Sequence, residues 1–231
     1  MFVFRDNLNS GILIHESEDL LIVDSIFHDN NSTAFYNNTN TLDPGGFRLA
    51  GGLVISWSST NERSTAVIRN CTFINNHANI NQLNRNDSRP NIYRPRGHGG
   101  AIVVSFENTE NHTLVIEKSQ ISNNTALFNG GGMFISFYSD SINNDIVITD
   151  STFENNSCVH AGGAISMNTF EVANGNILTV KNTAFERNSA WVGGGAYSLT
   201  LQVSVTDFSK PLLDCNWNLL HAIRGQVHED V

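Results

Sequence analysis

The sequence predicts an all-β fold, a single right-handed parallel β-helix of about seven coils that spans residues 1–231. Three observations lead there. A phrase recurs along the chain, with Phe-x-x-Asn followed by a Gly-Gly pair, and its copies from residue 121 onward are 32 residues apart. Aliphatic residues spaced by two precede each Phe, as in short strands with one buried face. Charged residues make up only 15% of the chain, while Asn fills about one position in seven, which argues against helical repeats.

The recurring phrase defines columns of residues that we expect to stack. Phe153-Glu154-Asn155-Asn156, which leads to Gly162-Gly163-Ala164-Ile165, is the fullest copy. A worn copy runs from Cys215 to Ala222. Ile121 takes the Phe position in one copy. The predicted structural residues are Phe27, Phe73, Phe153 and Phe185; Asn30, Asn76, Asn124, Asn156 and Asn188; and Gly52, Gly100, Gly132, Gly163 and Gly195.

Each position in the phrase has a physical role. The aliphatic residues five and seven places before Phe form a strand, and the odd step of five requires a bend before the Phe. The Asn suits a second bend because it tolerates left-handed backbone. The Gly pair suits a third, where φ is positive or another backbone approaches closely. After it we expect a further strand with one column made of Val54, Ile102, Phe134, Ile165 and Tyr197. A triangular coil results.

Phe-x-x-Asn paired with Gly-Gly-Ala-(Ile/Leu/Val) resembles the repeat of the chlamydial polymorphic outer membrane proteins. It is also similar to the repeat of many eukaryotic right-handed β-helix proteins, which share the pectin-lyase-like solenoid. The copy at 153–165 matches in full, whereas Ile121, Met133 and Tyr197 depart from the pattern. The resemblance implies a surface-displayed, adhesin-like or structural module without demonstrated catalysis.

Composition and sequons predict the compartment. The net charge of -9 argues against nucleic acid as a partner, and no apolar run is long enough for a membrane helix. Three cysteines, Cys71, Cys158 and Cys215, make no disulfide framework and are typical of buried small hydrophobes. Eight Asn-x-Ser/Thr sequons indicate an extracellular or cell-surface glycoprotein. We expect the chain to be a fragment of a longer protein. The candidate glycosylation sites are Asn30, Asn31, Asn37, Asn70, Asn86, Asn111, Asn123 and Asn155.

An enzymatic role is the main rival interpretation, because β-helices also carry polysaccharide lyases and glycosidases. Gly97-His98-Gly99 resembles the Gly-His-Gly of polygalacturonases, but the paired Asp and the Arg-Ile-Lys of that family are missing. Asp24 and Asp150 occupy one repeat position, which other copies fill with Asn70, Lys118 and Asn182, so a solvated corner is the favoured role. His77, His160 and His221 fall near one corner without metal-ligand spacing. We predict no catalytic residues, metal or cofactor.

The inserted loop at residues 79–98 is the segment that departs most from the repeat. It is net positive in an acidic chain and contains the candidate binding residues Arg85, Arg89, Tyr93, Arg94 and Arg96. Long loops on a rigid scaffold often carry recognition. The sequence thus predicts an extracellular structural or adhesin-like module with an anionic glycan or a cell-surface protein as partner. The alternatives are a carbohydrate-binding module and a degenerate polysaccharide lyase or glycosidase.

Overall fold

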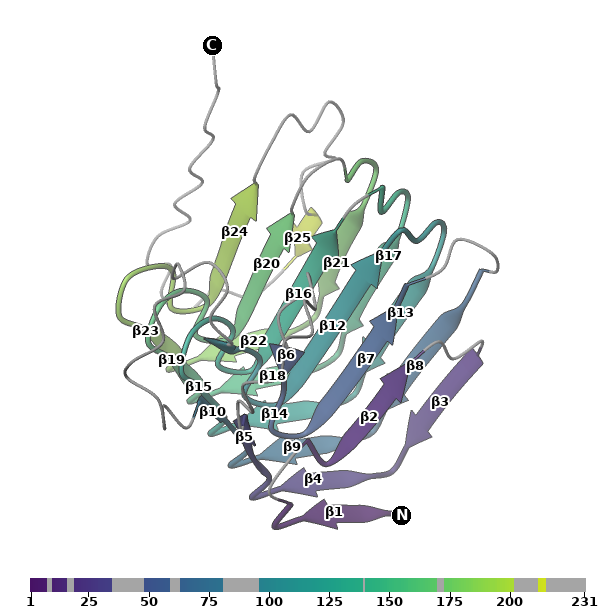
Figure 1. Ribbon diagram of the computed structural model, residues 1–231. Coiled ribbons are helices and arrows are strands. Elements are labelled where there is room, and N and C mark those ends of the chain that lie inside the picture. Colours follow the sequence, from purple (N-terminus) through teal and green to yellow (C-terminus); the bar gives the residue numbers. More distant parts are fainter. Residues whose placement is uncertain are drawn as a thin grey trace, which may run out of the picture.

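The computed structural model describes residues 1–7, 10–15, 19–34, 48–58, 63–80, 96–138, 140–169, 173–201 and 212–214, and every regular element in them is a β-strand. The strands stack in parallel layers, from the purple N-terminal coil to the yellow-green C-terminal coil (Figure 1). The predicted all-β parallel solenoid is therefore confirmed.

Three sheets contain six strands each, a fourth contains five, and one further pair is separate. Sheet A holds β1 (Val3–Arg5), β4 (Ile26–His28), β9 (Thr72–Ile74), β14 (Gln120–Ser122), β18 (Thr152–Glu154) and β22 (Ala184–Glu186). Sheet B holds β2 (Ile12–His15), β7 (Leu53–Trp57), β12 (Ile102–Glu107), β16 (Met133–Tyr138), β20 (Ile165–Thr169) and β24 (Tyr197–Leu201). Sheet C holds β3 (Asp19–Val23), β8 (Thr65–Arg69), β13 (Thr113–Glu117), β17 (Asp145–Thr149), β21 (Ile177–Lys181) and β25 (Leu212–Asp214). Sheet D holds β5 (Asn31–Ala34), β10 (His77–Ile80), β15 (Thr125–Ala126), β19 (Ser157–Cys158) and β23 (Ser189–Ala190), and β6 (Arg48–Leu49) pairs with β11 (Arg96–Gly97).

Each full coil visits sheets A, D, B and C in that order before it returns to A one layer further on. Sheet D was not foreseen, because its strands are short and follow the Asn corner directly. The described residues make six turns, counted by the six strands in sheets A, B and C, and the first of them has no described strand in sheet D. The worn copy at 215–222, which would supply a seventh, lies outside the described residues.

The predicted Phe column forms the centre of the core. Phe27, Phe73, Ile121 and Phe153 are paired in register on neighbouring strands and are fully buried. The rings of Phe27 and Phe73 stack with centroids 4.5 Å apart and an interplanar angle of 7°. Phe185 also packs on this core, although it is only partly buried. Stacking like residues over like lets each coil bury its neighbour's apolar face.

A second aromatic column was not predicted from the sequence. The rings of Trp57 and Phe106 lie 5.1 Å apart, and those of Phe106 and Phe137 lie 4.9 Å apart. All three side chains are buried in the last two residues of their strands in sheet B. The loops that follow these strands differ in length and sequence, so no shared motif marked the column.

The predicted column on sheet B was shifted by one residue in two coils. The inward column is Leu53, Ile102, Met133, Ile165 and Tyr197. Val54 and Phe134 lie one place further along, and with Ala50 and Val103 they form a separate buried cluster. Successive residues of a strand point to opposite faces, so a shift of one moves a side chain from the core to the outer face.

Candidate functional site

The Asn column is a continuous ladder of side-chain amides, which we call the Asn ladder: Asn7, Asn30, Asn76, Asn124, Asn156 and Asn188. From Asn7 to Asn156, each amide nitrogen donates to the Oδ1 of the Asn in the next coil, for example from Asn76 to Asn124 at 3.0 Å. The same nitrogen also donates to a backbone carbonyl of the preceding coil, as from Asn76 to Phe27 at 2.9 Å. The ladder members from Asn30 to Asn156 are fully buried. The left-handed backbone predicted for this Asn was one residue off, since it falls on the residue before, as at Asp29, Asn75 and Asn123. The predicted stacking of the Asn side chains is confirmed.

A shorter ladder of Asn amides lies at the corner between sheets B and C. It was not predicted, because no shared sequence motif marks it. The backbone N–H of His112 donates to Asn144 Oδ1 at 3.0 Å, and Asn144 Nδ2 donates to Asn176 Oδ1 at 2.9 Å. Both Asn side chains are buried. Their identical position before β17 and β21 is visible only once the strands are aligned.

The Gly-rich corner between sheets D and B has three columns with different demands. Gly99, Gly130 and Gly162 have positive φ values of 60°, 67° and 73°. The next column, Gly51, Gly100, Gly131, Gly163 and Gly195, is set by close approach, since a Cβ on Gly131 would lie 2.4 Å from the carbonyl oxygen of Gly163. Register places the predicted Gly52 and Gly132 in the third column, which also holds Ala101 and Ala164. The prediction was one residue off for those two glycines.

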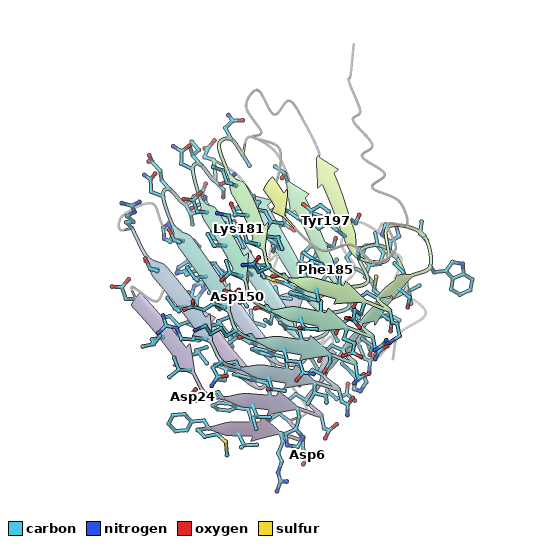
Figure 2. The ribbon with its side chains drawn as sticks, turned by 180° about the vertical axis from the view of Figure 1, so that it is seen from behind. Asp6, Asp24, Asp150, Lys181, Phe185 and Tyr197 are labelled. Carbon is cyan, nitrogen blue, oxygen red and sulfur yellow. The ribbon has the colours of Figure 1, made fainter. Side chains whose placement is uncertain are left out.

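The corner between sheets C and A carries Asp24, Asn70, Lys118, Asp150 and Asn182, all with left-handed backbone at φ values between 46° and 53°. Asn70 Nδ2 donates to Asp24 Oδ1 at 2.5 Å, one coil below. Asp24 and Asp150 lie on different coils along this corner (Figure 2). With Asn70 and Lys118 between them, they are three strand spacings apart, about 14 Å. That exceeds the roughly 6.5–9.5 Å between the paired carboxylates of inverting glycosidases.

Histidines occupy separate environments. His77 Nδ1 is 2.5 Å from the hydroxyl of Thr125 on the next coil. His160 instead contacts Asn129 Oδ1 at 2.8 Å and stacks on Phe128. His98 stacks on Phe134, with centroids 4.2 Å apart, at the outer face of sheet B. Register pairs His77 with Thr125 and hence with Ser157, so His160 lies three positions further along its coil than His77 does. His221 lies outside the described residues.

The described part of the chain contains no group of three His, Cys, Asp or Glu residues placed to hold a metal ion. Burial raises the pKa of the Cys158 thiol to about 11 and also raises that of the Cys71 thiol. Both are free and buried, as expected of small apolar residues. Cys215 lies outside the described residues.

The 79–98 insertion is described only at its ends. Arg85, Arg89, Tyr93 and Arg94 lie outside the described residues, and Arg96 begins β11. Both ends adjoin one point of the next coil, because Leu127 N–H donates to the carbonyl of Ala78 and Phe128 N–H to the carbonyl of Gly97, each within 2.9 Å. The chain thus leaves and re-enters the solenoid at a single corner.

A set of exposed apolar side chains begins beside that point and was not foreseen. Leu127, Val159 and Trp191 occupy equivalent positions after β15, β19 and β23, and Trp191 is 86% exposed. Val192 follows and is also exposed. The signal in the sequence was the placement of apolar residues two positions after each Ser or Thr that begins a sheet D strand.

The structure separates the sequons. Asn70, Asn111, Asn123 and Asn155 are exposed. Asn30 is fully buried in the Asn ladder, in contrast to those four. Asn31 is partly buried, and its Oδ1 accepts from Asn79 Nδ2 at 3.1 Å. Asn37 and Asn86 lie outside the described residues.

Comparison with known proteins gives one family match. Residues 150–168 match the model of the Chlamydia polymorphic membrane protein repeat. No curated protein and no solved structure gave a significant match. Among the described residues no helix has the length and apolar character to cross a membrane. The matched stretch runs from the corner residue Asp150 through Phe153, Asn156 and the Gly corner into β20, so the similarity lies in the copy for which the resemblance was predicted to be fullest.

Proposed function

We propose that this chain is an extracellular, non-catalytic rod that holds loops away from a surface in the manner of an adhesin. One observation carries the proposal. Strand pairing stays in register across the longest insertion, since Phe73 pairs with Ile121 as regularly as Ile121 pairs with Phe153. The insertion lies in the sequence between Phe73 and Ile121, whereas no long insertion separates Ile121 from Phe153. A scaffold whose strand pairing continues unchanged across a long inserted loop is suited to displaying such loops.

A structural role for the polar corner residues supports the non-catalytic part of the proposal. Asp24 and Asp150 stand in left-handed corners that other coils fill with Asn70, Lys118 and Asn182. Carboxylate, amide and ammonium groups alternate there, which is typical of a solvated turn rather than of an acid-base pair. The family repeat at 150–168 favours surface display by resemblance.

The Arg-bearing insertion is the proposed contact segment. Four Arg, at 85, 89, 94 and 96, lie within twelve residues of the sequence in a chain with a net charge of -9. Guanidinium groups bind carboxylate and sulfate with paired donors. An anionic glycan or an acidic cell-surface protein is therefore the proposed partner, and binding should weaken with salt because exposed charges are screened over about 8 Å at physiological ionic strength.

Retention on a heparin-like column tests this proposal. The parent chain is compared with a variant in which Arg85, Arg89, Arg94 and Arg96 are changed to Ser. A matched control changes Arg5, Arg63, Lys118 and Lys181 to Ser, which removes the same formal charge from exposed rod positions. We expect the parent and the control to elute at similar salt and the loop variant to elute earlier. Equal elution of all three would remove the loop from the contact surface.

A second candidate, binding of a neutral carbohydrate, is favoured by Trp191. Its indole is 86% exposed beside Ser189, and the sheet D strands contain no charged residue in the described chain. An aromatic ring with neighbouring hydroxyl groups offers an apolar face and hydrogen bonds together. Titration of Trp191 fluorescence with neutral oligosaccharides tests it against Trp191→Ala, and an unchanged spectrum at saturating sugar would reject it.

A further inference from the structure

Four sequons share one backbone geometry. Asn70, Asn111, Asn123 and Asn155 have left-handed φ values of 53°, 60°, 56° and 52° and are exposed. They stand at three corners of the coil: Asn111 between sheets B and C, Asn70 between C and A, and the other two between A and D. At each of these positions the chain turns sharply, so the amide projects from an edge of the solenoid.

The two residues after each of these Asn also follow one pattern. The second residue points into the protein and is buried: Cys71, His112, Asn124 and Asn156. The third begins or enters the next strand on the outer face and is partly exposed: Thr72, Thr113, Thr125 and Ser157. The amide and the hydroxyl of each sequon therefore face the same side of the chain, with the buried residue between them.

The hydrogen bonds of these amides are all made at the surface. Asn111 Nδ2 donates to Glu110 at 3.2 Å, and Asn155 Nδ2 donates to Glu154 at 3.3 Å. Asn155 Oδ1 accepts from Arg187 at 3.0 Å. Water replaces such exposed contacts at little cost, so a substituent on the nitrogen disturbs nothing in the core.

Asn30 shows the opposite arrangement because its sequon is displaced by one residue. Asp29 occupies the exposed corner with φ of 56°, and Asn30 takes the ladder position instead. Its amide nitrogen donates to the Phe4 carbonyl and to Asn76 Oδ1, both at 2.9 Å. Ser32, the hydroxyl residue of this sequon, is fully buried. A substituent on Asn30 would break the ladder.

We propose that Asn70, Asn111, Asn123 and Asn155 are N-glycan attachment sites, and that the sequons at Asn30 and Asn31 stay bare in the folded protein. This rests on the proposed extracellular location. The donor is an oligosaccharide linked to a lipid diphosphate. The amide nitrogen attacks the anomeric carbon, the new N–C bond forms, the C–O bond to the diphosphate breaks, and the amide loses one proton while the lipid diphosphate leaves with the bonding pair. The glycans project from the corners and leave the sheet faces uncovered.

The test expresses the chain behind a secretion signal in a eukaryotic host and isolates the secreted, monomeric protein. Enzymatic release of N-glycans in ¹⁸O-water marks each occupied Asn as a heavy Asp, which peptide mass spectrometry locates. We expect marks at Asn70, Asn111, Asn123 and Asn155 and none at Asn30 or Asn31.

Two variants test whether the corner geometry decides. His77→Thr completes a sequon at Asn75, which is exposed at the same corner as Asn123 with φ of 55°. Arg187→Asn does the same at position 187, before Asn188 and Ser189. Each is expected to add one marked position. His77→Thr places Thr in the column that already holds Thr125 and Ser157, so the fold should tolerate it.

Secreted protein that is bare at all four corners would overturn the proposal, as would a glycan on Asn30 in folded protein. Failure of both variants to gain a mark would show that the corner geometry does not direct attachment. The host supplies the compartment in this experiment, so bare corners leave the proposed surface display untouched. The column test of the Arg variant is made on protein from bacteria, which carries no such glycans, so its result tests the proposed contact segment independently of the glycan proposal.

Discussion

Asn124 Nδ2 donates to Asn156 Oδ1 at 3.0 Å, and the backbone N–H of Asn124 donates to the same oxygen at 3.1 Å. The amide of Asn124 also donates to the Phe73 carbonyl on the other side, at 3.0 Å. One buried side chain thus ties three coils together and satisfies backbone groups that the corner leaves without strand partners. Buried polar groups of this kind cost much more when unpaired than they contribute when paired.

Asn124→Asp should therefore destabilise the protein strongly. The carboxylate cannot donate to Phe73 or Asn156, and it is buried against two oxygen atoms. Unsatisfied buried groups cost about 1–3 kcal/mol each, so we expect a loss on the order of 3 kcal/mol or more in the free energy of unfolding. Urea denaturation followed by circular dichroism measures it.

Asn123→Asp is the matched control, since it makes the same chemical change one residue away. Asn123 is exposed in a left-handed corner that Asp29 occupies in another coil. Its unfolding free energy should stay within about 0.5 kcal/mol of the parent. Similar midpoints for both variants would show that the Asn ladder does not stabilise the fold.

Gly131→Ala and Gly132→Ala should differ although they are neighbours. A Cβ at position 131 would lie 2.4 Å from the oxygens of Gly163 and Ser157, both in the backbone. A Cβ at position 132 would lie 2.7 Å from the backbone oxygen of Ala164, but Ala101 and Ala164 already carry a Cβ in this column. We expect Gly131→Ala to lose about 1–3 kcal/mol or more by overpacking and Gly132→Ala to change stability by about 1 kcal/mol at most. A reversed order in thermal unfolding would contradict this register of the Gly corner.

Phe153→Ala should be more damaging than substitutions in the 79–98 insertion. The ring is fully buried and stacks on Phe185 with centroids 5.2 Å apart. Removing a buried Phe costs about 3–5 kcal/mol, and the adjacent coils lose a contact as well. Phe2→Ala, at a 71% exposed ring, and Tyr93→Ala serve as controls. Equal denaturation midpoints would remove Phe153 from the core.

The buried thiols give a pH-dependent prediction. Burial raises the pKa of Cys158 to about 11 from an ordinary 9.0, so the folded protein keeps the unreactive thiol at pH 8. Native Cys71 and Cys158 should alkylate slowly there and rapidly in denaturant, as site-resolved mass spectrometry would show. Because the unfolded chain loses this proton first, stability should fall as pH rises from about 9 towards 11. Fast native labelling at pH 8 would place these thiols at the surface.

The sequence revealed those features that repeat with one side-chain chemistry. Phe27, Phe73 and Phe153 share a motif with the Asn ladder, and side-chain identity at a fixed distance predicts stacking whatever lies between copies. The glycine register was harder, because the run Gly130-Gly131-Gly132 fits two alignments, and Ala50 replaces the first glycine in an earlier coil. Only strand pairing resolves which glycine meets the next backbone.

The candidate site was less predictable. Sequons are defined along the chain, whereas exposure of the acceptor amide depends on which of two adjacent residues turns outward, as the buried Asn30 and the exposed Asn123 show. The exposure of Trp191 follows from the absence of a covering segment among the described residues, which no local pattern encodes. The binding role of the charged loop at 79–98 stays a prediction, because its Arg residues belong to no repeated motif that would fix their positions.

A spin-label distance between positions 5 and 186 tests the central claim most directly. Both stand at equivalent sites on the first and last strands of sheet A, five strand spacings apart. Arg5→Cys and Glu186→Cys, in a chain with Cys215→Ser, accept the labels, and the stacked solenoid predicts a narrow distribution near 24 Å between the Cα atoms, from spacings of about 4.8 Å. A broad distribution, or one centred beyond about 40 Å, would contradict a single continuous β-helix, because ends separated by so many residues come this close only when each coil rests on the one before.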